Sequence, residues 1–263
     1  MSNTVRRKIA HTSIGSLVTL ASFSALSFGA QAEDAWQFSA TPYLFAPSIK
    51  GDASAGRFVN DTSIDVDSGD IFDHLDLGAM VHLETHHQSG WGAIVDYAFM
   101  DLYSKTQSPL NPDHQVKADV FQGTLEAFAA YRTTITPTDM IDTYAGIRWW
   151  DIDADLELRN GTTNPTVSSG DDWVDPVIGA RWTKQWSPDW KTSLDGNVGG
   201  FGIVSDFTAA LQAVVSYDIS DGISLAAGYK ALWVDYDNDK SGADHFAYDT
   251  VTHGPQIGVT FRF

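Results

Sequence analysis

The sequence contains no cysteine and few basic residues, and these two scarcities exclude several classes of protein. Without cysteine, the chain of 263 residues can form neither a disulfide framework nor a thiolate metal site. Lysine and arginine total 16 against 34 aspartate and glutamate residues, which gives a formal net charge of -18. Nucleic-acid binding depends on a basic surface that displaces counterions, so the charge balance argues against a nucleic-acid partner.

Long apolar runs are also scarce. No segment beyond the N-terminal region reaches the ~18 apolar residues that indicate a membrane-spanning helix. Aromatic residues, by contrast, are abundant, with nine Trp, nine Tyr and 14 Phe. A chain this rich in aromatic residues is not typical of intrinsic disorder, because it can bury enough apolar surface to fold.

The N-terminal region is typical of a secretory signal peptide. A basic start at residues 6–8 precedes an uncharged stretch at 14–28, and Ala30-Gln31-Ala32 supplies the small residues of a cleavage site. We therefore expect residues 1–32 to be a signal peptide for export from the cytoplasm. The folded domain is expected to cover residues 33–263.

Apolar and polar residues alternate with a period of two along most of the remaining chain. In the segment WKTSLDGNV at 190–198, Trp, Leu and Val share one face, while Lys, Ser, Asp and Asn share the other. Such alternation predicts a β-strand with one apolar and one polar face. We expect ten such strands, at residues 36–48, 78–87, 90–103, 116–132, 140–157, 173–186, 190–204, 207–218, 223–236 and 246–263.

The connections between these segments alternate in length. Compact turns of Gly, Pro, Asp and Ser are expected at 88–90, 136–139, 187–189 and 220–222. Long polar loops are expected at 50–77, 104–115, 158–172 and 237–245, with a short helical turn at Ile71–Leu75 inside the first. Short turns at one end and long loops at the other predict an all-β fold, a transmembrane antiparallel up-and-down β-barrel. We expect about ten strands, with eight as the alternative.

A soluble β-sandwich would show the same alternation but would bury its apolar faces. Aromatic residues near the ends of the apolar faces favour the membrane barrel, because such barrels carry aromatic girdles at both interfaces. These residues are Trp36, Trp91, Tyr131, Trp149, Trp182, Trp190, Tyr217 and Trp233. The apolar side chains are therefore expected to face lipid.

The chain ends on alternating apolar residues and an aromatic terminus, at Ile257, Val259, Phe261 and Phe263. With this ending and the overall pattern, the sequence resembles bacterial outer-membrane β-barrel proteins, such as the outer-membrane protein A and outer-membrane protein W groups. The resemblance implies a location in the bacterial outer membrane, in contact with its lipid and lipopolysaccharide. It also implies that these four residues form the signal read by the barrel-assembly machinery.

The polar faces would place charged residues of both signs in the lumen. The candidates are Glu84, Asp96, Glu126, Arg132, Arg148, Arg181, Asp195, Lys230 and Arg262. Buried charges must be paired or solvated, so the lumen is either a salt-bridged plug or a narrow water-filled passage. Glu126 and Arg148 are expected to pair, because both lie in the middle of adjacent strands.

The expected loops carry most of the negative charge. Their acidic residues include Asp65, Asp67, Asp70, Asp151, Asp153, Asp235 and Asp237. Such a surface attracts cations. Divalent cations could therefore bridge these loops to lipopolysaccharide phosphates, whereas the simpler interpretation is a solvated acidic surface.

Two more specific interpretations of the polar residues are a metal site and the active site of an enzyme. His82, Glu84 and His86 lie on one strand face, but successive side chains are ~7 Å apart, too far for one ion. We expect no metal and no cofactor. Carboxylates and histidines near the last loop, at Asp244, His245, Asp249 and His253, resemble the rim of ten-stranded outer-membrane proteases. They form no acid–base pair of fixed spacing.

We therefore expect a non-enzymatic outer-membrane barrel without catalytic residues. It would be either a narrow porin-like channel that favours cations or a structural barrel. An outer-membrane enzyme, or an adhesin or receptor that acts at the outer rim, remains the alternative.

Overall fold

The structure is a computed structural model that describes residues 35–55, 59–108, 111–159 and 166–263. Trp36–Phe263 form one compact unit, and the expected signal peptide lies outside the described residues. The elements are β1 (Trp36–Phe45), β2 (Ser48–Ala55), β3 (Val59–Val66), α1 (Ser68–His74), β4 (Leu75–His87), β5 (Trp91–Ser108), β6 (Asn111–Thr136), β7 (Asp139–Arg159), β8 (Thr166–Gln185), β9 (Trp190–Gly199), β10 (Phe207–Ser220), β11 (Ile223–Asp237), η2 (Gly242–Asp244) and β12 (Phe246–Arg262). Among the described residues, no helix is long and apolar enough to cross a membrane.

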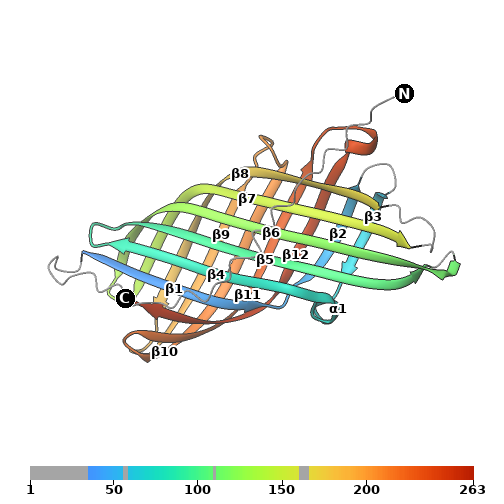
Figure 1. Cartoon of the computed structure of the whole chain (residues 1–263). Helices are drawn as coiled ribbons and strands as arrows, with labels where there is room; N and C mark the ends of the chain where they lie inside the picture. Colours follow the sequence, from blue (N-terminus) through green and yellow to red (C-terminus); the bar gives the residue numbers. More distant parts are fainter. Residues whose placement is uncertain (1–34, 56–58, 109–110, 160–165) are drawn as a thin grey trace. The chain divides into compact units, whose positions relative to one another are not determined.

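Ten of the strands form a closed antiparallel barrel (Figure 1). Their hydrogen-bonded order is β1-β4-β5-β6-β7-β8-β9-β10-β11-β12, and pairing of β1 with β12 closes the ring. The expected antiparallel up-and-down barrel of ten strands is thereby confirmed, and the alternative of eight strands is wrong.

The two ends of the barrel differ in their connections. Four tight connections, at 88–90, 137–138, 186–189 and 221–222, lie at the same end as the C-terminus, which we call the turn end. Helix α1 and the β2–β3 hairpin lie at the opposite end, which we call the loop end (Figure 1). The start of β1, the C-terminus and the short turns therefore share one side, as in outer-membrane barrels.

The first expected loop, at 50–77, is largely ordered into regular structure. After Pro47, β2 continues the direction of β1 and pairs with β12, while β3 pairs with β2. Helix α1 follows and contains most of the expected helical turn. Its Ile71 is only 2% exposed and packs with Ile49 of β2 and Met100 of β5, which explains why this acidic segment folds.

Several strands are also longer than expected. β6, β7 and β8 contain 26, 21 and 20 residues, so most of the expected loops at 104–115 and 158–172 is strand. A tilted strand needs only ~9–11 residues to cross a bilayer. The barrel therefore extends well beyond one membrane thickness. In contrast, β9 ends at Gly199 and not at residue 204, because positive φ angles at Gly200, Phe201 and Gly202 turn the chain.

Toward the turn end, the barrel has charged residues inside and apolar residues outside. Arg148 and Asp142 are 0% and 1% exposed, whereas Leu44 and Ile257 are 67% and 59% exposed. A soluble protein shows the reverse distribution. The soluble sandwich is therefore excluded, and the exposed apolar band is the surface that suits lipid.

This distribution inverts toward the loop end. Along β7, Trp149 lies on the outer face, but beyond it Trp150 and Ile152 are buried inside while Asp151 and Asp153 face outward. The same inversion occurs in β8, β11 and β12, where buried aromatic residues alternate with outward aspartates. The loop half is thus built like a soluble barrel, with an apolar interior and an acidic exterior.

The inversion corrects the placement of several acidic residues. Asp151 and Asp153 belong to β7, Asp235 and Asp237 to β11, and Asp65 to β3, so all five are strand residues and not loop residues. Their backbone groups stay in the sheet because the inward residues between them still bury apolar surface. Asp67 occupies the N-cap position of α1 without a side-chain capping hydrogen bond, and Asp70 lies in the first turn of that helix.

Candidate functional site

The barrel interior has three levels along its axis. A cavity lies at the turn end, a layer of ion pairs lies beyond it, and a cluster of aromatic side chains fills the loop end. We call these the vestibule, the charge layer and the aromatic plug.

The vestibule has a volume of about 690 Å³. Its walls carry many hydroxyl and amide side chains, including Ser39, Thr41, Ser193, Ser216 and Gln256. Its lining reaches Asp221, Gly222 and Phe263 at the turn end and the charge layer at the other. The volume lies in the range of ~300–1,000 Å³ that suits a small organic ligand, and the hydroxyl groups suit a polar one.

Glu84 on β4 is the centre of the charge layer. Arg181 on β8 reaches across the lumen and donates to both its carboxylate oxygens, at 2.6 and 2.8 Å. Arg132 on β6 donates to Glu84 at 3.2 Å and, through Nε and Nη2, to both oxygens of Asp142 at 2.7 and 2.9 Å. Asp142 also accepts from Arg181 at 2.8 Å. Two guanidinium groups thus neutralise two carboxylates in one network.

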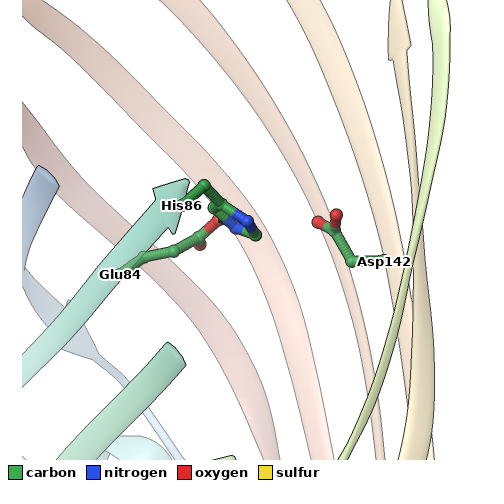
Figure 2. Close-up of side chains that lie close together, drawn as sticks. All are labelled: Glu84, His86 and Asp142. Atoms are coloured by element: carbon green, nitrogen blue, oxygen red, sulfur yellow. Dashed lines mark hydrogen bonds and ion pairs between the residues drawn. The ribbon is translucent and has the colours of Figure 1, made fainter. Parts of the chain in front are cut away.

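Glu84, His86 and Asp142 lie close enough to suggest a metal site, as Figure 2 shows. Their ligand atoms lie within 4.8 Å of one another. However, Nη2 of Arg132 lies 3.0 Å from Nε2 of His86 and also contacts both carboxylates. Because this cation already satisfies the three residues, the donor set does not fit an added divalent ion. Gly92 on β5 leaves the space that the His86 ring occupies.

A second network surrounds Asp96 on β5. Asp96 accepts a hydrogen bond from the Tyr43 hydroxyl at 2.8 Å and contacts His82 Nδ1 at 3.0 Å. Lys230 Nζ lies 3.7 Å from the same carboxylate. His82 also contacts Glu84 at 3.3 Å, so this network joins the first. His82 and His86 therefore flank Glu84 as hydrogen-bond partners.

Arg148 on β7 is the most deeply buried charge of the layer. It donates to Glu126 at 2.7 Å, to Thr208 at 2.8 Å and to Asn197 at 2.7 Å. The pair that the sequence predicted, Glu126 with Arg148, is present, and β6 and β7 place the two residues directly opposite each other. Each of the three guanidinium nitrogens thus has a hydrogen-bond partner inside the barrel.

Of the two remaining candidate lumen charges, Asp195 lies opposite Arg181 in the sheet and Arg262 lies nearer the turn end. Asp195 on β9 accepts from the Tyr144 hydroxyl at 2.6 Å. Arg262 on β12 donates to Asp218 at 2.8 Å and to Ser224. All nine candidate lumen charges named above therefore have interior side chains, and each has a polar partner inside the barrel.

The aromatic plug lies inside the barrel on the loop-end side of the charge layer. Trp173 on β8 stacks on Tyr236 of β11, with ring centroids 3.8 Å apart and planes at 5°. Trp150 lies 5.7 Å from Trp173 on the other side, and Phe246 lies 6.3 Å away. Because β8 and β11 are not neighbours in the sheet, this stack spans the lumen. The plug is completed by Ile152, Ala210, Leu232, Val234 and Tyr248.

A buried carboxylate anchors the plug to the barrel wall. Asp175 is fully buried and accepts from the backbone and hydroxyl of Ser205 at 2.9 and 2.7 Å. The Trp173 indole donates to Ser205 at 2.8 Å and to Asp175 at 3.2 Å. Sequence reasoning missed Asp175, Asp142 and the plug. Two signals were available. The alternation places Asp142 and Asp175 on the lumen-facing side of their strands, and after Trp149 the apolar and acidic residues exchange faces.

Outward carboxylates form cross-strand rows beyond the lipid-facing band at the loop end. Asp249 of β12 pairs in register with Asp235 of β11 and Asp52 of β2, and Asp151 of β7 pairs with Asp172 of β8. Burial, together with Asp249, raises the pKa of Asp235 above its ordinary value. Like charges directly opposite each other destabilise a sheet. We call these rows the carboxylate ladders.

The residues considered for a protease-like rim do not converge. His245 of the last loop lies 3.4 Å from Asp237 of β11, whereas His253 contacts the Tyr229 hydroxyl at 2.7 Å. Asp249 belongs to the carboxylate ladders on the outer face. These groups are therefore distributed over the outside of the barrel and do not surround one reacting position.

The residues of the expected assembly signal form the closing strand. Ile257, Val259 and Phe261 lie on β12, where Ile257 and Phe261 are exposed on the lipid-facing side. Phe263 follows the strand and exchanges backbone hydrogen bonds with Phe38, at 2.9 and 3.4 Å. The last residues thus join the two ends of the sheet.

Comparison with known proteins supports the fold alone. Neither a protein-family model nor a curated protein sequence matches the chain. Among solved structures, the chain is similar to the outer membrane protease OmpT from Escherichia coli, with a TM-score of 0.53 and 8% identity over 86% of this chain and 97% of that one. It is also similar to the translocator domain of the autotransporter NalP from Neisseria meningitidis, with a TM-score of 0.51 and 9% identity over 89% and 90% of the two chains. The chain therefore has the fold of a small bacterial outer-membrane β-barrel protein.

Proposed function

We propose that the protein is a non-enzymatic barrel of the bacterial outer membrane, closed toward the cell exterior and open toward the periplasm. Its vestibule would hold small polar or amphiphilic molecules that arrive from the periplasmic side. The observation that carries this proposal is the filling of the loop half by the aromatic plug, above a vestibule of about 690 Å³.

The short turns and the C-terminus support the orientation. In outer-membrane barrels these features face the periplasm, and the longer connections face the exterior. The vestibule would then face the periplasm, and the carboxylate ladders would lie near the outer surface. A cation-selective channel, the other interpretation of the charged lumen, would require both the plug and the charge layer to separate.

Single-cysteine variants test the proposed access, because the natural chain has no cysteine. Ser193→Cys places a thiol in the vestibule, and Ser241→Cys places one in the exposed last loop. With a polymer-linked maleimide too large for general porins, we expect Ser241→Cys to react in intact cells. Ser193→Cys should react only after the outer membrane is permeabilised. Labelling is measured by a gel shift.

Two results would contradict the proposal. Equal labelling of Ser193→Cys in intact cells would mean that the lumen is open to the exterior. Absence of labelling in permeabilised cells, while the denatured variant still reacts, would mean that the vestibule is closed to the periplasm. Ser241→Cys is the control for expression and surface exposure.

We also propose that divalent cations join the carboxylate ladders to lipopolysaccharide phosphates. The ladders lie just beyond the lipid-facing band, at the depth where lipid head groups would meet the barrel. Asp235, Asp249 and Asp52 present three carboxylates in adjacent strands, and a cation would relieve their repulsion.

Replacing Asp249 with asparagine should therefore stabilise the isolated protein. The pKa of Asp235 is raised in the folded state, so ionisation of this carboxyl lowers the free energy of unfolding as the pH rises above about 3.8. At neutral pH we expect Asp249→Asn to raise the free energy of unfolding by ~0.2–1 kcal/mol. Added Mg²⁺ should stabilise the natural protein more than the variant. Thermal unfolding with and without Mg²⁺ measures both effects.

Asp189→Asn in a turn-end connection is the matched control, because that carboxylate faces no ladder partner in the described register. Equal responses of the two variants to Mg²⁺ would contradict the proposed role of the ladders.

A further inference from the structure

The vestibule wall contains a patch of very small residues. Ala226 and Gly228 on β11 and Gly258 on β12 all line the vestibule, and Ala226 lies directly opposite Gly258 in the sheet. Because alanine and glycine project little or nothing from a strand, a molecule in the vestibule can approach the backbone closely at this patch. We call these three residues the floor.

Polar side chains surround the floor. Gln256 of β12 lies directly opposite Gly228, and Ser216 of β10 lies directly opposite Ala226. Residues that pair in this way project from the same face of the sheet, which here is the lumen face. Gln212, further along β10, also lines the vestibule. We call the floor and its polar surroundings the niche.

The amide of Gln256 lacks a partner. The residue is only 9% exposed, and its amide oxygen is buried without a hydrogen-bond partner in the described part of the chain. A buried polar atom without a partner is unfavourable, and such atoms are uncommon in folded proteins. A half-turn of the amide exchanges its oxygen and nitrogen, so Gln256 can offer either an acceptor or a donor to a molecule in the vestibule. The empty niche thus leaves unused a group that a ligand would satisfy.

Two further side chains of the niche have unused hydrogen-bonding capacity. Gln212 forms no side-chain hydrogen bond with another described residue. Asp195 on β9 lies directly opposite Gln212 and also lines the vestibule. Its Oδ1 accepts from Tyr144, whereas no described residue donates to its Oδ2. The niche therefore presents two amides and one carboxylate oxygen to a ligand.

The neighbouring cations select against an ionic ligand. Arg181, opposite Asp195 on the other side, is held by two other carboxylates at 2.6 and 2.8 Å. Lys230, opposite Gln212, lies 3.7 Å from a third. Because both cations are already paired, they offer little attraction to an anion, and they oppose a further cation beside Asp195. Hydroxyl groups avoid both difficulties, since each is uncharged and both donates and accepts.

We propose that the niche binds a neutral sugar of one or two rings. The ring would lie over the floor, its hydroxyls would bond to the amides of Gln212 and Gln256, and one would donate to Oδ2 of Asp195 in a charge-assisted hydrogen bond. The vestibule volume of about 690 Å³ suits a molecule of this size. The inference rests on the proposed vestibule and specifies its ligand class.

Calorimetric titration of the purified protein in detergent micelles tests the site. The probes are glucose, galactose and N-acetylglucosamine, and the reference is cyclohexanol, which has a ring of similar size with one hydroxyl. We expect at least one sugar to bind at least about tenfold more tightly than cyclohexanol, since tenfold corresponds to about one hydrogen bond.

A variant of the floor tests where the sugar binds. Ala226→Leu fills the space over the floor and should abolish sugar binding, because the ring can no longer approach the backbone. Ala213→Leu is the matched control, because it introduces the same side chain at an exposed position on the outer face of β10. The control should keep the affinity of the natural protein.

Gln256→Met separates a binding role from a structural one. It replaces the amide with an apolar side chain of similar volume, so it should weaken sugar binding at least about tenfold. Because the amide oxygen has no partner in the free protein, the free energy of unfolding should stay the same or rise. A variant that loses stability but keeps its affinity for sugar would show that Gln256 serves the fold.

The outcomes also separate the niche from the proposed function. Ser193→Cys lines the vestibule and reports access by its reaction with N-ethylmaleimide in the folded protein. If this thiol does not react, the open vestibule itself is wrong. If it reacts but none of the three sugars binds more tightly than cyclohexanol, the niche is not a sugar site. The same conclusion follows if Ala226→Leu keeps the natural affinity.

Discussion

Replacing Arg148 with methionine should destabilise the barrel by ~3–5 kcal/mol, because it leaves the buried carboxylate of Glu126 without its positively charged partner. Arg148 is fully buried and is the hydrogen-bond donor to Glu126, Thr208 and Asn197. Methionine fills a similar volume without charge, so the loss reports the missing ion pair and hydrogen bonds. Equilibrium unfolding in lipid vesicles, followed by tryptophan fluorescence, measures the difference.

The double variant Arg148→Met/Glu126→Leu provides the control. Since it removes both charges, it should be more stable than Arg148→Met alone, although Thr208 and Asn197 still lose their partner. If the single variant unfolds within about 1 kcal/mol of the natural protein, the charge layer is solvated and does not hold the barrel closed.

Removal of the central plug residue should have a comparable effect. Trp173→Ala is expected to cost ~3–5 kcal/mol, because it leaves a cavity between Trp150 and Tyr236. It also deprives Asp175 and Ser205 of the indole donor. The same unfolding measurement applies.

Trp186→Ala is the matched control, since Trp186 is 64% exposed in the turn-end connection at 186–189. We expect a clearly smaller loss there. Equal losses for the two variants would mean that the plug contributes no more than a surface tryptophan, and that the loop half is not held by its interior.

In the turn half, the barrel and the direction in which its side chains point could be predicted from the alternation together with the aromatic residues and the short turns. In the segment from Trp190 to Val198, every apolar side chain faces outward and every charged one inward, as the pattern indicates. Glu126 and Arg148 could be paired because they lie in the middle of neighbouring strands. Contacts across the lumen, such as Glu84 with Arg181, depend on barrel radius and strand tilt, which a single sequence does not contain.

The loop half could not be predicted in the same way. The residues from Trp149 to Ala154 keep the strict alternation, but the face that carries the aspartates points outward. A rule that assigns apolar side chains to lipid fails where a strand leaves the membrane, because water then solvates the outer face. The rule therefore places these acidic segments in loops, although their period of two is that of strands.

The inverted loop half has a consequence for insertion. In the proposed orientation, the loop end leads through the bilayer, and it carries outward carboxylates on several adjacent strands. Each ionised group must pass through hydrocarbon before it reaches the far side, which opposes spontaneous entry into an intact bilayer. Translocation therefore depends on a thinned or opened lipid region. A helper that provides one would speed biogenesis without changing the final equilibrium.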